Sequence, residues 1–378
     1  MAAPRILISA GEPSGDLHGA GVARALLRRW PDARLYGFGG SLMRAAGVEL
    51  LAHVDDLAVM GFAEVARHLP FFLRLLRDVR RRLTDEPPDL VVPIDYPGFN
   101  LRLARMAKER GIPVLYYIAP QVWAWHSSRV RELARNTDRL AVILPFEAQL
   151  FEEAGAHTAF VGHPLLDLRS EPPARAQFCS RLGLDAARPI LALFPGSRAQ
   201  EVRRHLSLFE AAAERVRVHR PDVQPVIAVG SAVPPALYAS AGSVRTPDNA
   251  ALLQHASAAL VKSGTTTLQA AIAGTPLVIA YRMHPLSYVI ARRVVEVDHV
   301  GLVNLVAGER LAPEYIQGEA TPDALAAALL PLLADGPERT RMLAGLARVR
   351  ASLQPPPGAG DAADQIARLA GELIETHE

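Results

Sequence analysis

Residues 6–20, ILISAGEPSGDLHGA, join a short apolar run to a glycine-rich turn and the start of a helix. The run 6–9 is rich in isoleucine and leucine, which favours a buried strand. Gly11 and Gly15 either let the backbone approach a ligand closely or simply form a plain turn between strand and helix. Asp16 falls in the first helical turn, where a negative charge suits the helix dipole. This order is typical of the unit that begins a parallel sheet covered by helices.

Similar apolar runs alternate with amphipathic segments along most of the chain. The alternation predicts an α/β fold of two Rossmann-like, doubly wound domains, with ligands bound at the carboxyl ends of parallel strands. After residue 321 the pattern is wholly helical. The predicted strands are 5–9, 34–38, 89–94, 113–118, 138–144 and 157–161 in the first half, and 189–194, 223–229, 257–261 and 276–280 in the second.

Changes in composition place the domain boundaries. The predicted first domain is 1–166, followed by a polar, proline-containing linker at 167–188 and a second domain at 189–353. Residues 354–378 hold a Pro/Gly hinge and a last helix. Such a hinge before a terminal helix suggests that the helix packs back on the first domain.

Charge and cysteine content exclude several classes of protein. The 378 residues carry a formal net charge of +2, so the sequence gives no general electrostatic argument for nucleic-acid binding. Of 41 basic residues only Lys108 and Lys262 are lysines. The single cysteine, Cys179, excludes an intramolecular disulfide and a cysteine-based zinc cluster. With no signal-peptide pattern at the start, we expect a cytoplasmic protein.

One candidate catalytic residue follows the buried strand 89–94. Asp95, in the segment IDYPGFN, stands where a general base belongs in a doubly wound domain. Partial burial there would raise the pKa of its carboxyl group. The alternative is that Asp95 caps the helix that starts near Gly98. Two other loops also follow predicted strands of this half. The loop with Gln121 and Trp123 either forms an aromatic wall of a binding site or belongs to the core. The segment with His163 provides either a substrate contact or a packing residue.

Two turns of the second half resemble anion sites. In FPGSR, residues 194–198, backbone N–H groups, a hydroxyl and a guanidinium precede a helix, which suits a diphosphate. In KSGTTTLQ, residues 262–269, a strand ends in a small polar turn before another helix. The alternatives are a surface arginine and an ordinary helix cap.

The stretch 57–83 has an apolar helical side edged by arginines. Such a helix either lies in a membrane interface or packs on the core with its arginines in solvent. The residues of the predicted membrane patch are Val65, Leu69, Phe71, Phe72 and Leu75 with Arg67, Arg74 and Arg81.

Taken together, these segments resemble the lipid-A-disaccharide synthase family, glycosyltransferases of the GT-B type. The resemblance spans most of the chain and rests on several motifs in order. They are 10–19 (AGEPSGDLHG), 59–62 (VMGF), 94–100 (IDYPGFN), 119–125 (APQVWAW), 161–164 (VGHP), 193–198 (LFPGSR), 263–265 (SGT), 281–283 (YRM) and 304–308 (NLVAG).

The resemblance implies inverting transfer of 2,3-diacylglucosamine from its UDP derivative to the 6-hydroxyl of 2,3-diacylglucosamine 1-phosphate, without metal or other cofactor. Asp95 would be the general base. The implied UDP-sugar site comprises Gly196, Ser197, Arg198, Ser263, Gly264, Thr265, Thr266, Gln269 and Asn304. The implied acceptor side comprises Gly11, Glu12, Ser14, Gly15, Asp16, Asn100, Gln121, Trp123 and His163.

Two positions depart from the family pattern, and two other functions stay open. Gln269 stands where the family commonly has a glutamate for the ribose, and Pro13 replaces an alanine. A UDP-N-acetylglucosamine 2-epimerase-like enzyme would share the UDP site, and a non-catalytic nucleotide-sugar-binding protein would not need Asp95. The family also implies peripheral contact with the cytoplasmic face of the inner membrane. The sequence leaves the oligomeric state open, a homo-oligomer included.

Overall fold

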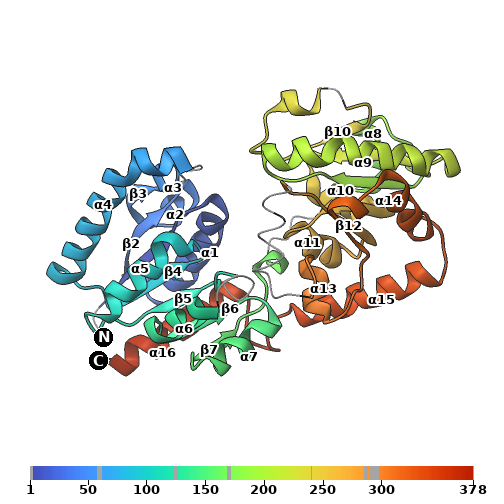
Figure 1. The fold of residues 1–378 in the computed structure, drawn as a ribbon. Coiled ribbons are helices and arrows are strands. Elements are labelled where there is room, and N and C mark those ends of the chain that lie inside the picture. The colour runs from blue at the N-terminus through green and yellow to red at the C-terminus, as the bar shows by residue number, and fades with distance from the viewer. Residues whose placement is uncertain are drawn as a thin grey trace. The chain divides into compact units, whose positions relative to one another are not determined.

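A computed structural model describes residues 3–57, 62–121, 127–167, 172–239, 241–284, 288 and 298–377. The chain divides into two compact units (Figure 1). The first unit is Met1–Leu168 together with Leu353–Glu378, and the second is Arg169–Ser352. Each unit contains one parallel sheet with helices against it, so the predicted α/β fold is confirmed.

The first unit is built on a seven-stranded sheet in the order β3-β2-β1-β4-β5-β6-β7. Strands β1 and β4 are central neighbours, and Ala10 at the end of β1 pairs with Ile94 at the end of β4. The sequence pattern missed β3, an edge strand whose side chains are only partly buried. The strands are β1 (Arg5–Ala10), β2 (Arg34–Gly39), β3 (Glu49–His53), β4 (Leu90–Ile94), β5 (Leu115–Tyr117), β6 (Arg139–Val142) and β7 (Thr158–Phe160).

Helices form an apolar core on each face of this sheet. One core contains residues of α1 and α16, and the other contains residues of α4, α5, α6 and α7. The helices are α1 (Pro13–Arg29), α2 (Ser41–Ala45), α3 (Val54–Leu57), α4 (Phe62–Asp85), α5 (Pro97–Lys108), α6 (Ser127–Asn136), α7 (Pro145–Glu153) and α16 (Ala362–His377), with the 3₁₀ turn η2 at Pro164–Leu166.

The C-terminal helix α16 lies along α1, although more than 300 residues separate them in the sequence (Figure 1). Ile366 and Leu369 are buried in the same core as Ile6 of β1. Arg28 and Arg29 at the end of α1 form ion pairs with Asp364 and Glu375. The last helix therefore completes the core of the first unit.

Helix α4 is described in full as a helix, but its side chains are described only from Arg74 onward. The predicted membrane residues Val65, Arg67, Leu69, Phe71 and Phe72 therefore lie outside the described side chains. Arg74 and Arg81 are exposed, whereas Leu75 packs, half-buried, against the core. Leu75 is thus at least partly a core residue. No described helix has both the length and the apolar character that a membrane span requires.

The second unit has a six-stranded parallel sheet in the order β10-β9-β8-β11-β12-β13. The sequence pattern missed β10 and β13, which are three-residue edge strands and too short to show a periodicity. The strands are β8 (Ile190–Phe194), β9 (Gln224–Ala228), β10 (Val244–Thr246), β11 (Ala258–Lys262), β12 (Leu277–Tyr281) and β13 (Glu314–Ile316).

The expected linker 167–188 is largely part of this second unit. Its residues 175–182 form helix α8, which buries Phe178 and Cys179. The other elements are α9 (Ala199–His219), α10 (Asn249–His255), α11 (Thr266–Ala273), α13 (Leu302–Ala307), α14 (Pro322–Leu329) and α15 (Pro337–Ser352), with the 3₁₀ turns η3 (Pro235–Tyr238), η4 (Gln317–Glu319) and η5 (Leu330–Leu332).

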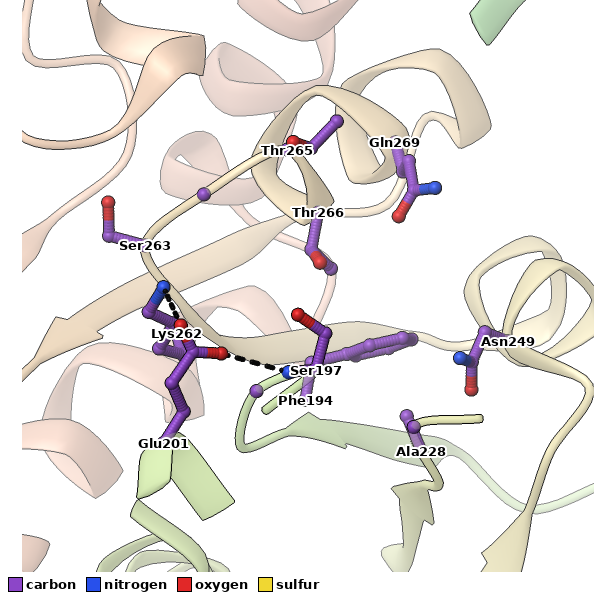
Figure 2. A pocket seen from close by; sticks show the side chains of 13 residues that line it. Phe194, Ser197, Glu201, Ala228, Asn249, Lys262, Ser263, Thr265, Thr266 and Gln269 are labelled. Carbon is purple, nitrogen blue, oxygen red and sulfur yellow. Dashed lines mark hydrogen bonds and ion pairs between the residues drawn. The ribbon is translucent and has the colours of Figure 1, made fainter. Parts of the chain in front are cut away.

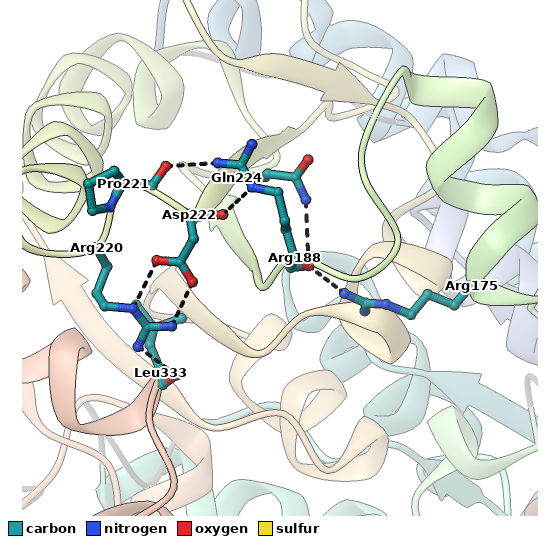
Figure 3. Close-up of polar contacts among 7 residues, drawn as sticks. All are labelled: Arg175, Arg188, Arg220, Pro221, Asp222, Gln224 and Leu333. Atoms are coloured by element: carbon teal, nitrogen blue, oxygen red, sulfur yellow. Dashed lines mark hydrogen bonds and ion pairs between the residues drawn. The ribbon is translucent and has the colours of Figure 1, made fainter.

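Arginine side chains hold backbone carbonyls at the amino ends of strands in this unit (Figure 3). Arg188 precedes β8 and donates to the carbonyls of Pro221 and Asp222, at 2.8 Å each. Arg175 in turn donates to the carbonyl of Arg188 at 2.8 Å. A planar guanidinium can serve two or three carbonyls at once, which an ammonium on a single stem does less well. Part of the arginine excess is therefore structural.

Replacing Arg188 by lysine should lower the stability of the protein. Lysine keeps the charge but cannot reach the Pro221 and Asp222 carbonyls with a fixed fork, so we expect a loss of about 1–2 kcal/mol in the free energy of unfolding. Urea unfolding measures this, with Arg181→Lys on the exposed side of α8 as the matched control. Equal stability of the two variants would contradict a stabilising role for the hydrogen bonds from Arg188 to the Pro221 and Asp222 carbonyls.

Candidate functional site

Asp95 and Tyr96 form a sharp corner between β4 and α5. Both residues have positive φ angles, 45° and 49°, which residues other than glycine rarely adopt. Hydrogen bonds fix the backbone there: the Asp95 N–H donates to the Tyr117 carbonyl at 3.0 Å, and the Tyr116 hydroxyl donates to the Asp95 carbonyl at 2.7 Å. Strained backbone of this kind persists when the surroundings over-determine it and is common at functional sites.

The Asn100 side chain ties this corner to the sheet. It is fully buried, and its Nδ2 donates to the carbonyls of Ser9, Ile94 and Asp95 at 2.8–3.1 Å. Its Oδ1 accepts from the Ser9 hydroxyl at 2.6 Å. The Asn100 side chain therefore joins the ends of β1 and β4 and holds the Asp95 backbone.

The Asp95 carboxyl group has an environment that suits a general base. Burial raises its pKa to about 6, and the negative charge of Glu12 adds to the increase. A hydrogen bond from the Tyr96 N–H acts in the opposite direction. Asp95 is therefore ionised at neutral pH but more basic than an exposed aspartate, which favours proton abstraction. Helix α5 is capped at Tyr96, without a side-chain cap, so capping does not account for Asp95.

The glycine-rich turn packs against this corner. A Cβ atom at Gly11 would lie 2.1 Å from Cδ1 of Tyr96, and one at Gly15 would lie 3.1 Å from the Cβ of Ala10. Glu12 and Ser14 are exposed on the same turn. The turn is therefore glycine-rich because the Tyr96 ring and the strand ends fill the space next to it.

Asp16 has a structural role in this unit. Its buried carboxylate accepts from the N–H groups of Gly40, Leu42 and Met43 at 2.7–3.1 Å, and so caps helix α2. These three bonds join α1 to the end of β2, since Gly40 directly follows that strand. The Asp16 carboxylate is therefore engaged with backbone N–H groups of the fold.

His163 is buried beyond the end of β7. Its Nδ1 accepts from the Leu165 N–H at 3.2 Å, which leaves the proton on Nε2. Burial lowers its pKa to about 4, with a smaller contribution from His18, so His163 is neutral at pH 7. Gln121 is exposed, and Trp123 lies outside the described residues. The described candidates of the first unit thus divide into exposed groups and groups used by the fold.

The second unit contains a cavity of about 290 Å³ at the carboxyl ends of β8, β9 and β11 (Figure 2). Seven of the predicted UDP-sugar residues line it, which are Gly196, Ser197, Ser263, Gly264, Thr265, Thr266 and Gln269. Figure 2 shows the side chains of Ser197 and Thr266 facing each other across the cavity. The two turns that the sequence singled out therefore form one pocket.

Two predicted residues are not part of this lining. Arg198 is the N-cap of α9 and is exposed. Asn304 is fully buried, where its Nδ2 donates to the Ala312 carbonyl and to Glu314 Oε1, at 2.8 Å each. The side chain of Asn304 joins α13 to β13, so its hydrogen-bonding capacity is used within the protein.

The pocket is also lined by six residues that were not among the predicted site residues. They are Phe194, Glu201, Ala228, Gly230, Asn249 and Lys262. The signal for Phe194, Ala228 and Lys262 was available, because each is the last residue of a strand. The Oδ1 atom of Asn249 is buried and has no hydrogen-bond partner in the described part of the chain. A buried acceptor without a donor is rare in proteins and is consistent with a ligand that supplies one.

A lysine supplies positive charge to the pocket. Lys262 Nζ lies 2.8 Å from Glu201 Oε1 and 5.5 Å from the centre of the Tyr281 ring. Glu201 Oε2 accepts from the N–H groups of Ser197 and Arg198 at 3.0 and 3.3 Å. The N–H groups that the sequence offered for a diphosphate at this turn are therefore engaged. At the start of α11, the N–H groups of Thr267 and Leu268 donate to the carbonyls of Gly264 and Thr265 at 3.0 Å each, so these donors are also engaged within the turn.

Solved structures with the same architecture identify the fold. A calicheamicin glycosyltransferase superposes with a TM-score of 0.60 at 21% identity, covering 100% of this chain and 98% of that chain. The UDP-GlcNAc 2-epimerase from Neisseria meningitidis bound to UDP-GlcNAc gives 0.62 at 10% identity, covering 98% and 100%. The fold is that of the GT-B glycosyltransferases.

Sequence relatives identify the family within this class. The family model described as lipid-A-disaccharide synthetase matches residues 6–356, and the chain belongs to this family of glycosyltransferases. The lipid-A-disaccharide synthase of Geobacter sulfurreducens is 40% identical over 377 residues, which cover 98% of this chain and 97% of that protein. That of Trichlorobacter lovleyi is 42% identical over 378 residues, 98% of each chain.

Replacing Gly11 by alanine should disturb the Asp95 corner. The new methyl group would overlap the Tyr96 ring, so we expect a loss of about 1–3 kcal/mol in the free energy of unfolding, together with lower activity. Gly98→Ala is the matched control, since nothing lies within 4 Å of a Cβ at that position. Denaturant unfolding of both variants measures the difference. If Gly11→Ala were as stable as Gly98→Ala, the packing described here would be incorrect.

Proposed function

We propose that the protein transfers 2,3-diacylglucosamine from UDP-2,3-diacylglucosamine to the 6-hydroxyl of 2,3-diacylglucosamine 1-phosphate with inversion at the anomeric carbon. Membership of the lipid-A-disaccharide synthase family supports the choice of substrates. The observation that carries the reaction is the Asp95 carboxyl group, held at a strained strand end with its pKa raised to about 6.

The proposed reaction is a single displacement. The Asp95 carboxylate takes the proton of the acceptor 6-hydroxyl, and this oxygen bonds to the anomeric carbon of the donor. The bond from that carbon to the diphosphate breaks, and its electron pair leaves with UDP. Attack from the side opposite the leaving group inverts the configuration and requires no covalent intermediate.

The pocket of the second unit is the proposed UDP site. Lys262 and the turn at residues 263–266 would neutralise the diphosphate, with hydroxyl contacts from Ser197 and Thr266. Gln269 would bind the ribose without the charge of a glutamate. The unpartnered Asn249 acceptor matches the N–H donor of a uracil base. Arg198, exposed at the turn, remains a proposed phosphate contact, and Asn304 would act through the fold around the pocket.

The proposed acceptor side lies around the Asp95 corner. Glu12, Ser14 and Gln121 are exposed polar groups that we propose for this side, and neutral His163 has a ring N–H to offer. Gly11, Gly15, Asp16 and Asn100 would support this side by shaping the turn and the strand ends. Trp123 keeps its proposed role as part of an apolar wall.

Asp95→Asn should abolish most of the transfer. Removal of a general base typically costs about 10²–10⁴-fold in rate, and UDP release in the presence of acceptor measures it. In the wild type, the rate should fall with decreasing pH below about 6, because the Asp95 carboxylate becomes protonated. Unchanged turnover in the variant would exclude this role, and equal turnover of unacylated UDP-N-acetylglucosamine would favour an epimerase-like enzyme.

The same variant makes an independent prediction for stability. The pKa of Asp95 is raised from 3.8 to about 6 in the folded protein, so the protonated carboxyl group stabilises the folded state relative to the ionised one. This contribution to the free energy of unfolding is fully present below pH 3.8 and is lost as the pH rises through about 6. Asp95→Asn avoids the loss. It should therefore be more stable than the wild type at pH 8 and no more stable near pH 4, as measured by urea unfolding at both values.

We also propose that α4 contacts an anionic membrane surface peripherally. Arg74 and Arg81 are exposed on this helix. Each basic residue near such a surface contributes about 1 kcal/mol, so Arg74→Glu with Arg81→Glu should weaken binding to phosphatidylglycerol vesicles at least about tenfold. The control is the double variant Arg341→Glu with Arg350→Glu, which changes two exposed arginines of α15 and makes the same change in net charge. Equal co-sedimentation of the two double variants would remove the proposed contact.

A further inference from the structure

The carboxylate of Glu201 contacts the positively charged and N–H donor groups of the pocket. Glu201 Oε2 accepts from the Ser197 N–H group, and Oε1 lies 2.8 Å from Lys262 Nζ (Figure 2). Oε2 also accepts from the Arg198 N–H group. The side chains of Glu201 and Lys262 are only 21% and 18% exposed. Backbone N–H groups at the start of a long helix and an ammonium group are also what a phosphate would use.

The turn before α9 is shaped around this carboxylate. Gly196 has a φ angle of 136°, and a Cβ atom there would lie 2.4 Å from Cβ and 2.7 Å from Oε2 of Glu201. Burial acts to raise the pKa of Glu201, but Lys262 and the two N–H groups outweigh it and hold the pKa below its usual value. Glu201 is therefore ionised at neutral pH and neutralises Lys262.

We propose that Glu201 competes with the nucleoside diphosphate for Lys262, and that Lys262 moves from Glu201 to the diphosphate when the ligand binds. This inference rests on the proposed function of the pocket as a UDP site. Glu201 keeps its two backbone N–H donors, because these are fixed by the turn, whereas the lysine side chain can rotate.

The consequence is a lower affinity for UDP than the pocket could otherwise reach. A diphosphate that enters must break an ion pair and then lies near a negative charge of the protein. Both effects act on the product UDP as well as on the donor. Glu201 would thus favour product release, at the expense of tight binding.

The test is UDP binding to four proteins by calorimetry at fixed salt: wild type, Glu201→Gln, Lys262→Met and the double variant. Glutamine still accepts from the turn but leaves Lys262 without its counter-ion. Loss of one competing charge should therefore tighten UDP binding about fivefold to tenfold in Glu201→Gln. Lys262→Met should weaken it, and the gain from Glu201→Gln should vanish in the Lys262→Met background. Uridine, which has no phosphate, should bind equally to wild type and Glu201→Gln.

Several outcomes would overturn the inference. UDP binding to Glu201→Gln that is equal to or weaker than that of the wild type would mean that Glu201 serves only as a helix cap. A gain that persists without Lys262 would exclude the competition. If neither wild type nor Glu201→Gln binds UDP or uridine, the proposed nucleotide site itself fails, and the inference with it.

A structure of the wild-type protein with UDP gives a second test that needs no variant. In that structure we expect Lys262 Nζ to contact a phosphate oxygen and to lie beyond hydrogen-bond distance of Glu201 Oε1. A Lys262–Glu201 pair that stays intact beside bound UDP would contradict it.

Discussion

The amide of Asn100 is the contact on which the candidate catalytic corner depends. It is fully buried and supplies donors to the carbonyls of Ser9, Ile94 and Asp95 at the ends of two adjacent strands. Without it, these carbonyls would lose a donor in a region closed to water, which is costly. The positive φ angles of Asp95 and Tyr96 persist because these bonds and the Tyr116 hydroxyl bond outweigh the backbone strain.

Each unit places charged groups at the carboxyl edge of its sheet, but with opposite electrostatic effects. In the first unit, burial and Glu12 raise the pKa of Asp95 and make it a better proton acceptor. In the second, Lys262 and backbone N–H groups keep Glu201 ionised against the effect of burial. The proposed base and the proposed anion site require these different environments, and the same type of fold provides both.

Much of the fold could be predicted from the sequence because buried parallel strands are continuous apolar runs. The runs at 5–9, 89–94 and 189–194 correspond to central strands with buried side chains on both faces. The edge strands β3, β10 and β13 escaped prediction because they are short or only partly buried. The sequence pattern predicts a linker where helix α8 forms, because this polar, proline-flanked segment shows little of the apolar face that it buries through Phe178.

The sequence by itself determined the family, the strand-end position of Asp95 and the two polar turns that line the pocket of the second unit, because glycine-rich turns after apolar runs are local features. Only the tertiary structure showed that Asp16, Asn100 and Asn304 are engaged by the fold. It also showed that Glu201 occupies the N–H groups of Ser197 and Arg198 and pairs with Lys262, 61 residues away. Which polar groups remain for a ligand depends on contacts between distant segments, and these are fixed only when the sheets and helices pack.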